Sequence, residues 1–272
     1  MVQTKKDPVL AVLSLSGGND GLNMVIPRNN GYYRDFRPTL AVPEDQIIPI
    51  NDELGFHPTM GPLKKFWDEG KMAIFVGIGY PTPSYSHFRS MDIWHTCEPE
   101  VIGTEGWLGR ATKQMDPNAE NVLTAVNFGR GLPRALVMDG VPVASVGNLE
   151  TYGLLTGIEG ESQRNEALDI FGRMYSPAIG TGAVMDYIHQ TGTDALKGAD
   201  ILATAPDKYS SSVEYSPTAI GQYMKNIAQT HLAGFGTRVL YTTSPYNLSL
   251  IHISEPTRRY AIADAGVGVE KK

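Results

Sequence analysis

The stretch L-A-V-L-S-L-S-G-G-N-D-G-L-N, residues 10–23, decides the fold class of this chain. It begins as a short apolar run, which is typical of a buried β-strand. Three glycines then surround a single carboxylate, Asp20, and glycine lets a ligand approach the main chain closely. Ligands of open α/β sheets gather just beyond the carboxyl ends of the strands. The pattern therefore predicts an α/β fold with Asp20 at a metal or anion site.

A plain turn explains the same residues without any ligand. Asp and Asn side chains hydrogen-bond to nearby backbone and favour turns, so G-G-N-D-G can be only a tight turn. The run lacks the G-x-G-x-x-G spacing of a dinucleotide fingerprint and the Lys-Ser or Lys-Thr pair of a P-loop. Asn19 and Asn23 flank Asp20, and each either contacts a bound anion or stabilises the turn.

The rest of the chain continues the α/β pattern. Residues 9–15 and 72–78 are continuous apolar runs, as expected of strands that are covered on both faces. A helix expected over 57–69 lies between them, and this order predicts a parallel sheet with helices outside it. Further strands are expected over 122–128, 135–138 and 237–243, and further helices over 161–175 and 216–232.

Composition excludes several classes of protein. A net charge of -6 argues against a nucleic-acid partner, which needs a basic surface. No apolar stretch approaches the roughly 18 residues of a membrane span. The first residues lack the apolar region and cleavage site of a signal peptide, so the chain as written is expected to be cytoplasmic. The single cysteine, Cys97, excludes an intramolecular disulfide.

A second candidate for chemistry is P-T-P-S-Y-S-H-F, residues 81–88, where a helix is expected to begin near Ser84 or Ser86. A hydroxyl at a helix N-terminus lies beside free N–H groups in a positive field, where phosphate or sulfate binds readily. Such a serine is a candidate nucleophile, and His87 and Arg89 are close enough in sequence to help hold an anion. The structural alternative is that Ser86 only caps the helix, since serine is a preferred cap.

Five motifs of the chain together resemble a known family. They are G-G-N-D-G-L-N-M-V-I-P (17–27), Y-Y-R-D-F-R-P-T-L (32–40), G-F-H-P-T-M (55–60), P-T-P-S-Y-S-H-F-R-S-M-D-I-W (81–94) and G-W-L-G-R (106–110). In this order they resemble a bacterial domain-of-unknown-function family that is placed in the alkaline phosphatase and sulfatase superfamily. The resemblance covers residues 9–247.

The resemblance implies a three-layer α/β/α sandwich with a mostly parallel sheet, and a metal-dependent hydrolase of small phosphate or sulfate esters. The superfamily sets a metal-binding Asp after its first strand, which matches Asp20, and a nucleophile at a helix N-terminus, which matches Ser84 or Ser86. Zinc or manganese is the implied metal, with calcium as a further candidate. The resemblance also implies an exported, periplasmic protein. The family's activity is unsettled, so a non-catalytic exported binding or assembly protein on the same fold stays open as the alternative.

The last part of the chain departs from the family. The Asp-Thr-His and Gly-Thr-Asp-His-Gly motifs that would supply the remaining metal ligands do not occur, nor does the family's twin-arginine export signal. Instead, L-S-L-I-H-I-S-E-P-T-R (248–258) resembles the translation of a common transposase sequencing adapter. We therefore expect residues 1–247 to be a partial alkaline-phosphatase-like domain and residues 248–272 to be a non-native tail. The metal site is then incomplete, and the chain as written is expected to lack hydrolase activity.

Overall fold

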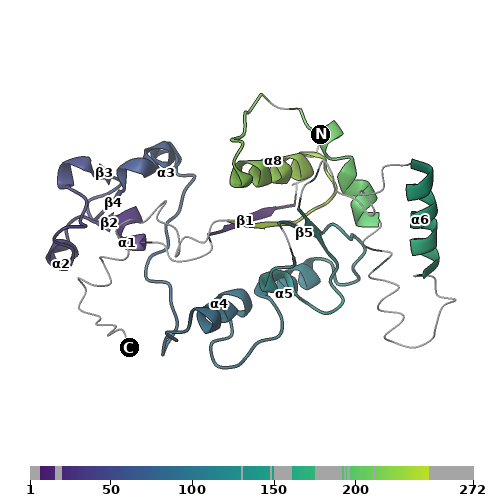
Figure 1. The fold of residues 1–272 in the computed structure, drawn as a ribbon. Coiled ribbons are helices and arrows are strands. Elements are labelled where there is room, and N and C mark those ends of the chain that lie inside the picture. Colours follow the sequence, from purple (N-terminus) through teal and green to yellow (C-terminus); the bar gives the residue numbers. More distant parts are fainter. Residues whose placement is uncertain are drawn as a thin grey trace, which may run out of the picture. The chain divides into compact units, whose positions relative to one another are not determined.

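The computed structural model describes residues 7–15, 20–129, 131–147, 149, 161–174, 192, 194, 197–210 and 212–244 (Figure 1). The described residues form two compact units. The first unit contains residues up to Ser14 together with those from Tyr80 onward, and the second contains those between Leu15 and Gly79. Each unit is described by itself below.

The first unit is built on a four-stranded parallel sheet. Its strands are β1 (Leu10–Ser14), β5 (Ala125–Phe128), β6 (Val143–Val146) and β7 (Val239–Thr243), in the order β1-β7-β5-β6. All three strand pairs are parallel, and Ser14 lies opposite Thr243 while Phe128 lies opposite Thr242 and Val146. The carboxyl ends of the strands therefore meet at one edge of the sheet. The predicted α/β class with a parallel sheet is confirmed.

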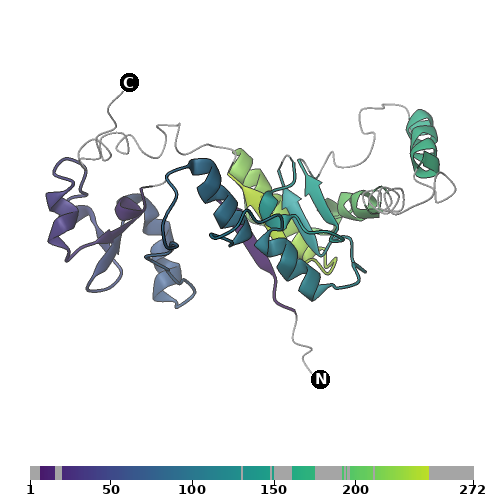
Figure 2. The same ribbon diagram turned by 90° about the horizontal axis from the view of Figure 1, so that it is seen from below.

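Helices pack against both faces of this sheet (Figures 1 and 2). Side chains alternate between the two faces along a strand, so β5 sends Val126 and Phe128 to one face and Ala125 to the other. Val126 and Phe128 pack with Ile227 of α8 (Ala219–Leu232) in one core cluster. Ala125 packs with Leu108 of α5 (Trp107–Met115) in a second cluster. This unit also contains α4 (His87–Thr96) and α6 (Glu161–Met174), and residues 197–203 are helical as well.

The G-W-L-G-R motif brings α5 close to the segment that precedes β6. Gly106 precedes the first turn of α5 and donates its N–H to the carbonyl oxygen of Val137 at 2.7 Å. A Cβ at Gly106 would overlap main-chain atoms of Ala135 and the carbonyl oxygen of Arg134. A Cβ at Gly109 would lie 2.7 Å from the carbonyl oxygen of Val137. Both glycines of the motif are therefore required by close backbone packing.

The second unit contains a small antiparallel sheet. Its strands are β2 (Val25–Pro27), β3 (Ile48–Pro49) and β4 (Leu54–Phe56), in the order β2-β4-β3. Around them lie α1 (Gly21–Met24), α2 (Gly31–Asp35), a 3₁₀ turn (Glu44–Gln46), a 3₁₀ helix (Pro58–Leu63) and α3 (Lys64–Asp68). One core cluster consists of Ile26, Tyr33, Val42 and Ile47, and Phe56 of β4 is also fully buried. The sequence pattern gave no sign of this sheet, because strands of two or three residues are too short to display alternation.

Several elements differ from the expected ones. Residues 72–78 form no strand, and Phe75 and Ile78 are 81% and 62% exposed. An apolar run becomes a strand only where a neighbouring strand pairs with it, which the run itself does not encode. Residues 135–138 likewise form no strand, because Arg134–Leu136 is a 3₁₀ turn and the edge strand is β6. The helix expected from residue 216 begins at Ala219, where the Thr218 hydroxyl accepts the N–H of Gly221.

The first strand is confirmed in position but not in burial. Leu10 and Leu13 of β1 are 46% and 40% exposed. Within the described residues β1 pairs only with β7, so its other edge has no strand beside it. An edge strand is covered less completely than a central one, which explains why an entirely apolar sequence remains half exposed here.

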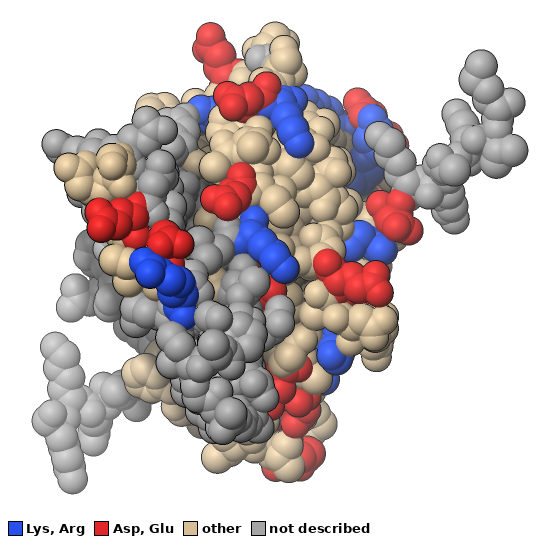
Figure 3. Space-filling view, turned by 90° about the vertical axis from the view of Figure 1, so that its right-hand side faces the viewer, with Lys and Arg blue, Asp and Glu red and all other residues tan. Residues whose placement is uncertain are grey.

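Charged side chains are interspersed on the surface. On the face shown in Figure 3, acidic and basic residues lie beside one another rather than gathering by sign. Several form pairs within one helix, such as Lys64 with Asp68 and Arg173 with Asp169, each four residues apart. The helices of the described segments include none long and apolar enough to cross a membrane.

Asp116 follows α5 and holds the turn that leads to β5. Its carboxylate accepts the N–H groups of Glu120 and Asn121 at 2.9 and 3.0 Å and the hydroxyl of Thr124 at 2.9 Å. Burial raises the pKa of Asp116, but these hydrogen bonds and the charge of Lys113 outweigh burial and hold the pKa below its usual value of 3.8.

Asp116→Asn is therefore expected to destabilise the protein at neutral pH and to do so less as the pH falls. A carboxyl group with a lowered pKa in the folded state contributes stability above its unfolded pKa, and this is lost as the pH falls through the folded pKa. We expect the urea midpoints of the wild type and the variant to differ at pH 7 and to converge below about pH 4. The exposed Asp139→Asn serves as the control, and a difference that stays constant down to pH 2 would contradict this account.

Candidate functional site

Asp20, the candidate metal ligand, lies at the start of α1 in the second unit. The N–H groups of Asn23 and Met24 donate to its main-chain carbonyl oxygen at 3.0 Å. Its carboxylate forms an ion pair with Arg37, with 2.6 Å between Oδ2 and Nη1. The two side chains are 7% and 15% exposed, so this pair is largely shielded from water. The carboxylate is thus held in place by a cation of the protein itself.

Asn23 lies in the same part of the unit and has both ends of its amide engaged. Its Oδ1 accepts the hydroxyl of Tyr33 at 2.8 Å, and its Nδ2 donates to the carbonyl oxygen of Leu40 at 3.1 Å. The Tyr33 hydroxyl in turn accepts the N–H of Val42 at 2.9 Å. Burial raises the pKa of Tyr33, and this outweighs the hydrogen bond from Val42, which lowers it. The raised pKa keeps the phenol protonated, so that it can donate to Asn23.

These contacts correspond to the structural alternative for Asn23, in which the amide stabilises the turn. A cofactor would have to displace one of two existing hydrogen bonds to reach it. Asn19, the other flanking candidate, lies outside the described residues.

The serine candidates lie at the start of α4 in the first unit. The Ser86 hydroxyl accepts the N–H of Arg89 at 3.4 Å and so caps the helix. The Ser84 hydroxyl accepts the N–H of Ser86 at 3.2 Å. Ser86 and His87 are both exposed. The expected helix start is confirmed, and Ser86 has the capping role that was weighed against a nucleophilic one.

Tyr80 joins this cluster, and the sequence reasoning did not single it out. Its phenol oxygen lies 3.3 Å from the Ser90 hydroxyl and accepts the N–H of Ser84 at 3.0 Å. The hydrogen bond with Ser90 and the N–H of Ser84 hold the pKa of Tyr80 below its usual value, and the charge of Arg89 adds to this. A tyrosine in the turn just before a serine-capped helix is a signal that sequence reasoning could have used.

Arg89, the candidate anion ligand, holds a loop of its own chain. Its Nη2 donates to the carbonyl oxygens of Glu98, Pro99 and Val101 at 3.3, 2.9 and 2.8 Å. Arg110 supports the same region by donating to the Thr96 carbonyl oxygen at 2.6 Å. The Nη2 group of Arg89 therefore stabilises the loop after α4, whereas its Nη1 group is buried without a hydrogen-bond partner among the described residues.

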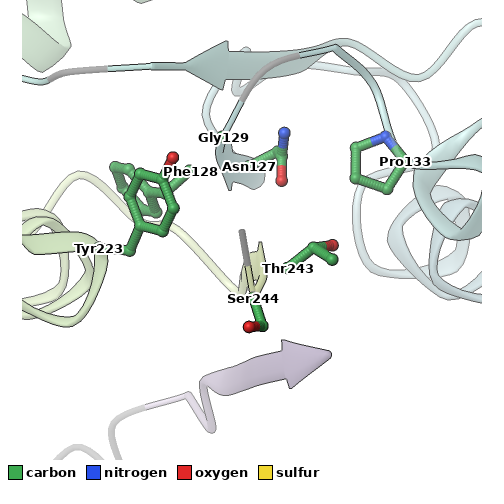
Figure 4. Close-up of a pocket in the computed structure, with 7 residues that line it drawn as sticks. All are labelled: Asn127, Phe128, Gly129, Pro133, Tyr223, Thr243 and Ser244. Carbon is green, nitrogen blue, oxygen red and sulfur yellow. The ribbon is translucent and has the colours of Figure 1, made fainter. Parts of the chain in front are cut away.

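A cavity opens at the carboxyl ends of β5 and β7, also in the first unit. Its volume is about 320 Å³ (Figure 4). Gly129 at the end of β5 has a φ of 151°, which only glycine adopts readily, so the chain turns sharply at the mouth of the cavity. The lining residues are Asn127, Phe128, Gly129, Pro133, Tyr223, Thr243 and Ser244.

The sequence reasoning named none of these lining residues. It expected ligands at this edge of the sheet and placed its candidate residues after the strands expected over 9–15 and 72–78, not after β5 or β7. The signals available were a polar residue inside an apolar strand, V-N-F, followed by G-R-G, and the hydroxyl run T-T-S at the end of β7.

The predicted residues therefore gather in two places. Asp20 and Asn23 lie in the second unit, and Ser84, Ser86, His87 and Arg89 lie in the first. Over the segments that the structure describes, no group of three or more His, Cys, Asp or Glu side chains is placed to hold a metal ion. The described residues supply Asp20 as a single candidate ligand and do not by themselves make a metal site.

Comparisons of the chain with protein-family models, with curated proteins and with solved structures give no match. The function is therefore argued from the chain's own residues.

Proposed function

We propose that this chain is a relative of the metal-dependent hydrolases of phosphate and sulfate esters, built on an alkaline-phosphatase-like three-layer fold. Asp20 would be the metal ligand that follows the first strand, and Ser86 or Ser84 the nucleophile. Bound metal would polarise an oxygen of the ester as a Lewis acid. The substrate class is a small ester with an anionic phosphate or sulfate group.

The observation that carries this proposal is the cavity at the carboxyl edge of the parallel sheet. This edge is where open α/β sheets bind ligands. The N–H of Ser244, which lines the cavity, donates to the carbonyl oxygen of Ser14 at 2.8 Å. The last residue of β1 is thus bonded to the cavity wall.

The helix that begins at His87 gives further support. Ser84 and Ser86 lie ahead of a ten-residue α-helix, and the first N–H groups of such a helix favour a negative charge. Ser86 is exposed, so a substrate can reach its hydroxyl. The hydrogen bond that this hydroxyl accepts from the N–H of Arg89 is long at 3.4 Å.

One observation favours a second candidate function, a non-catalytic binding or assembly protein on the same fold. Arg37 already neutralises the Asp20 carboxylate at 2.6 Å. A metal ion at Asp20 would have to displace this guanidinium or share the carboxylate with it, whereas a purely structural Asp20 needs no further partner.

Mn²⁺ binding separates the two candidates. Because Asp20 is one ligand of an incomplete set, we expect the purified chain to bind Mn²⁺ only weakly, measured at high Mn²⁺ concentration by the loss of the free-ion signal in electron paramagnetic resonance. Asp20→Asn should weaken this binding about tenfold or more, because the amide oxygen carries no charge. Arg37→Met should strengthen it, because the carboxylate is then free of its competing cation.

Asp68→Asn is the matched control in the same unit, since Asp68 is exposed and pairs with Lys64. Its Mn²⁺ affinity should equal that of the wild type. Equal Mn²⁺ binding by the wild type and Asp20→Asn, with both chains folded by circular dichroism, would refute the metal-site proposal and favour the non-catalytic function.

A further inference from the structure

Asn127 presents a fixed hydrogen-bond acceptor to the cavity at the carboxyl ends of β5 and β7. The residue is only 2% exposed. Its Nδ2 donates to the carbonyl oxygen of Gly131 at 2.9 Å and to the Ser145 hydroxyl at 2.8 Å. A carbonyl oxygen can only accept, so the nitrogen must face Gly131 and the orientation of the amide is determined. The oxygen is then forced to the opposite side.

This opposite side is the cavity. Figure 4 shows the amide oxygen of Asn127 pointing into the space between Tyr223, Pro133 and Thr243. Among the described residues no group donates to this oxygen. Because the oxygen faces the open cavity, a bound ligand can donate to it without displacing a group of the protein.

The rest of the lining defines the chemistry of that ligand. Thr243 brings a hydroxyl group to the cavity, while Tyr223, Phe128 and Pro133 give it apolar walls. None of the described lining residues is charged, and an ionic group needs a charged partner when it leaves water. A volume of about 320 Å³ is at the lower end of the range for small-molecule sites. The cavity thus suits a small, neutral ligand with several hydroxyl groups and one apolar face.

We propose that this cavity binds a polyol or a monosaccharide, with a ligand hydroxyl donating to Oδ1 of Asn127. This assignment goes beyond the proposed hydrolase function and does not depend on it. The Thr243 hydroxyl donates to or accepts from a second ligand hydroxyl, and the ring of Tyr223 packs against the apolar face of the ligand.

Binding of a free sugar or polyol tests the proposal without any hydrolysis. The probes are methyl α-D-glucopyranoside and myo-inositol, added to the full 272-residue chain and followed by saturation-transfer-difference NMR. We expect at least one of them to bind the wild type. Thr243→Val removes a hydroxyl at constant shape and should weaken binding about fivefold, the loss of one hydrogen bond.

Asn127→Leu removes the acceptor as well and should abolish binding, but it also breaks the bonds to Gly131 and Ser145. If Asn127→Leu does not fold, the Thr243→Val variant alone still tests whether the cavity binds the probe. The control is Thr204→Val, because Thr204 lies outside the cavity and donates to the Ile201 carbonyl oxygen. It should bind both probes as the wild type does.

Three results would overturn the proposal. One is that neither probe binds, a second is that Thr243→Val binds as tightly as the wild type, and a third is that inorganic phosphate displaces the probe from the cavity. Mn²⁺ binding at Asp20 is measured separately, so failure here and failure of the proposed function are distinguishable. If the chain binds a sugar but its Mn²⁺ binding does not depend on Asp20, the proposed sugar site stands and the proposed hydrolase function is refuted.

Discussion

Gly106→Ala is expected to destabilise the first unit by about 3 kcal/mol, the upper end for an inserted methyl group in a packed interior. The new Cβ would overlap main-chain atoms of Ala135 and Arg134, which cannot rotate away as a flexible side chain can. To remove this steric overlap, α5 would have to move away from residues 134–138. The hydrogen bond from Gly106 to Val137 would then lengthen, and the contact of Leu108 with the sheet would loosen.

Thermal or urea unfolding measures this effect, with an expected fall of the melting temperature by roughly 6 to 12 °C. Gly109→Ala should act in the same direction, since its Cβ would lie 2.7 Å from the Val137 carbonyl oxygen. The matched control is Gly147→Ala, where an added Cβ meets nothing within 4 Å. It should change stability by less than about 0.5 kcal/mol. Equal stability of Gly106→Ala and Gly147→Ala would show that α5 does not pack as closely as described.

Asp20→Asn is expected to destabilise the second unit by about 2 to 3 kcal/mol, because it leaves the Arg37 guanidinium without a counter-ion in a largely buried position. This expected loss of stability is smaller than the loss for a fully buried ion pair, because the Arg37 side chain remains 15% exposed. Arg37→Met should destabilise by a similar amount, since it leaves the carboxylate unpaired. The double variant should be more stable than the sum of the single effects predicts, because it removes both charges together.

Urea unfolding of the four chains gives the interaction energy, and amide hydrogen exchange over residues 20–56 assigns the loss to the second unit. The Lys64–Asp68 pair provides the control cycle. It lies on the surface of α3, so its coupling energy should be about 0.5 kcal/mol or less. A cycle in which Asp20 and Arg37 show no more coupling than this surface pair would contradict the buried ion pair.

The elements that the sequence predicted correctly carry their signal locally. Strands β1, β5 and β7 are short apolar runs next to glycine, proline or polar residues, and these runs are recognisable without knowledge of the neighbours. Helix α4 was found through its serine cap and α8 through its repeating apolar side chains. The parallel sheet followed from the alternation of such strands with helices.

The elements that the sequence did not predict depend on partners. Residues 72–78 and 135–138 are as apolar as β5, but no strand pairs with them. The cavity also depends on contacts between distant parts of the chain. Asn127 and Thr243 are far apart in the sequence and come together only when β5 and β7 pair. For Ser86 and Asn23 both a structural and a ligand role were foreseen, and the choice between them depends on contacts with Arg89, Tyr33 and Leu40.

The exposed run at residues 72–78 has a consequence for the behaviour of the chain in a cell. It contains no charged residue and no proline, which is the composition of segments that stack into cross-β fibrils. Gly77 has a φ of 69°, a left-handed conformation that interrupts an extended strand after Val76. This single kink divides the run into pieces shorter than the six or seven residues that a steric zipper needs, so we expect it to disfavour self-assembly through this run.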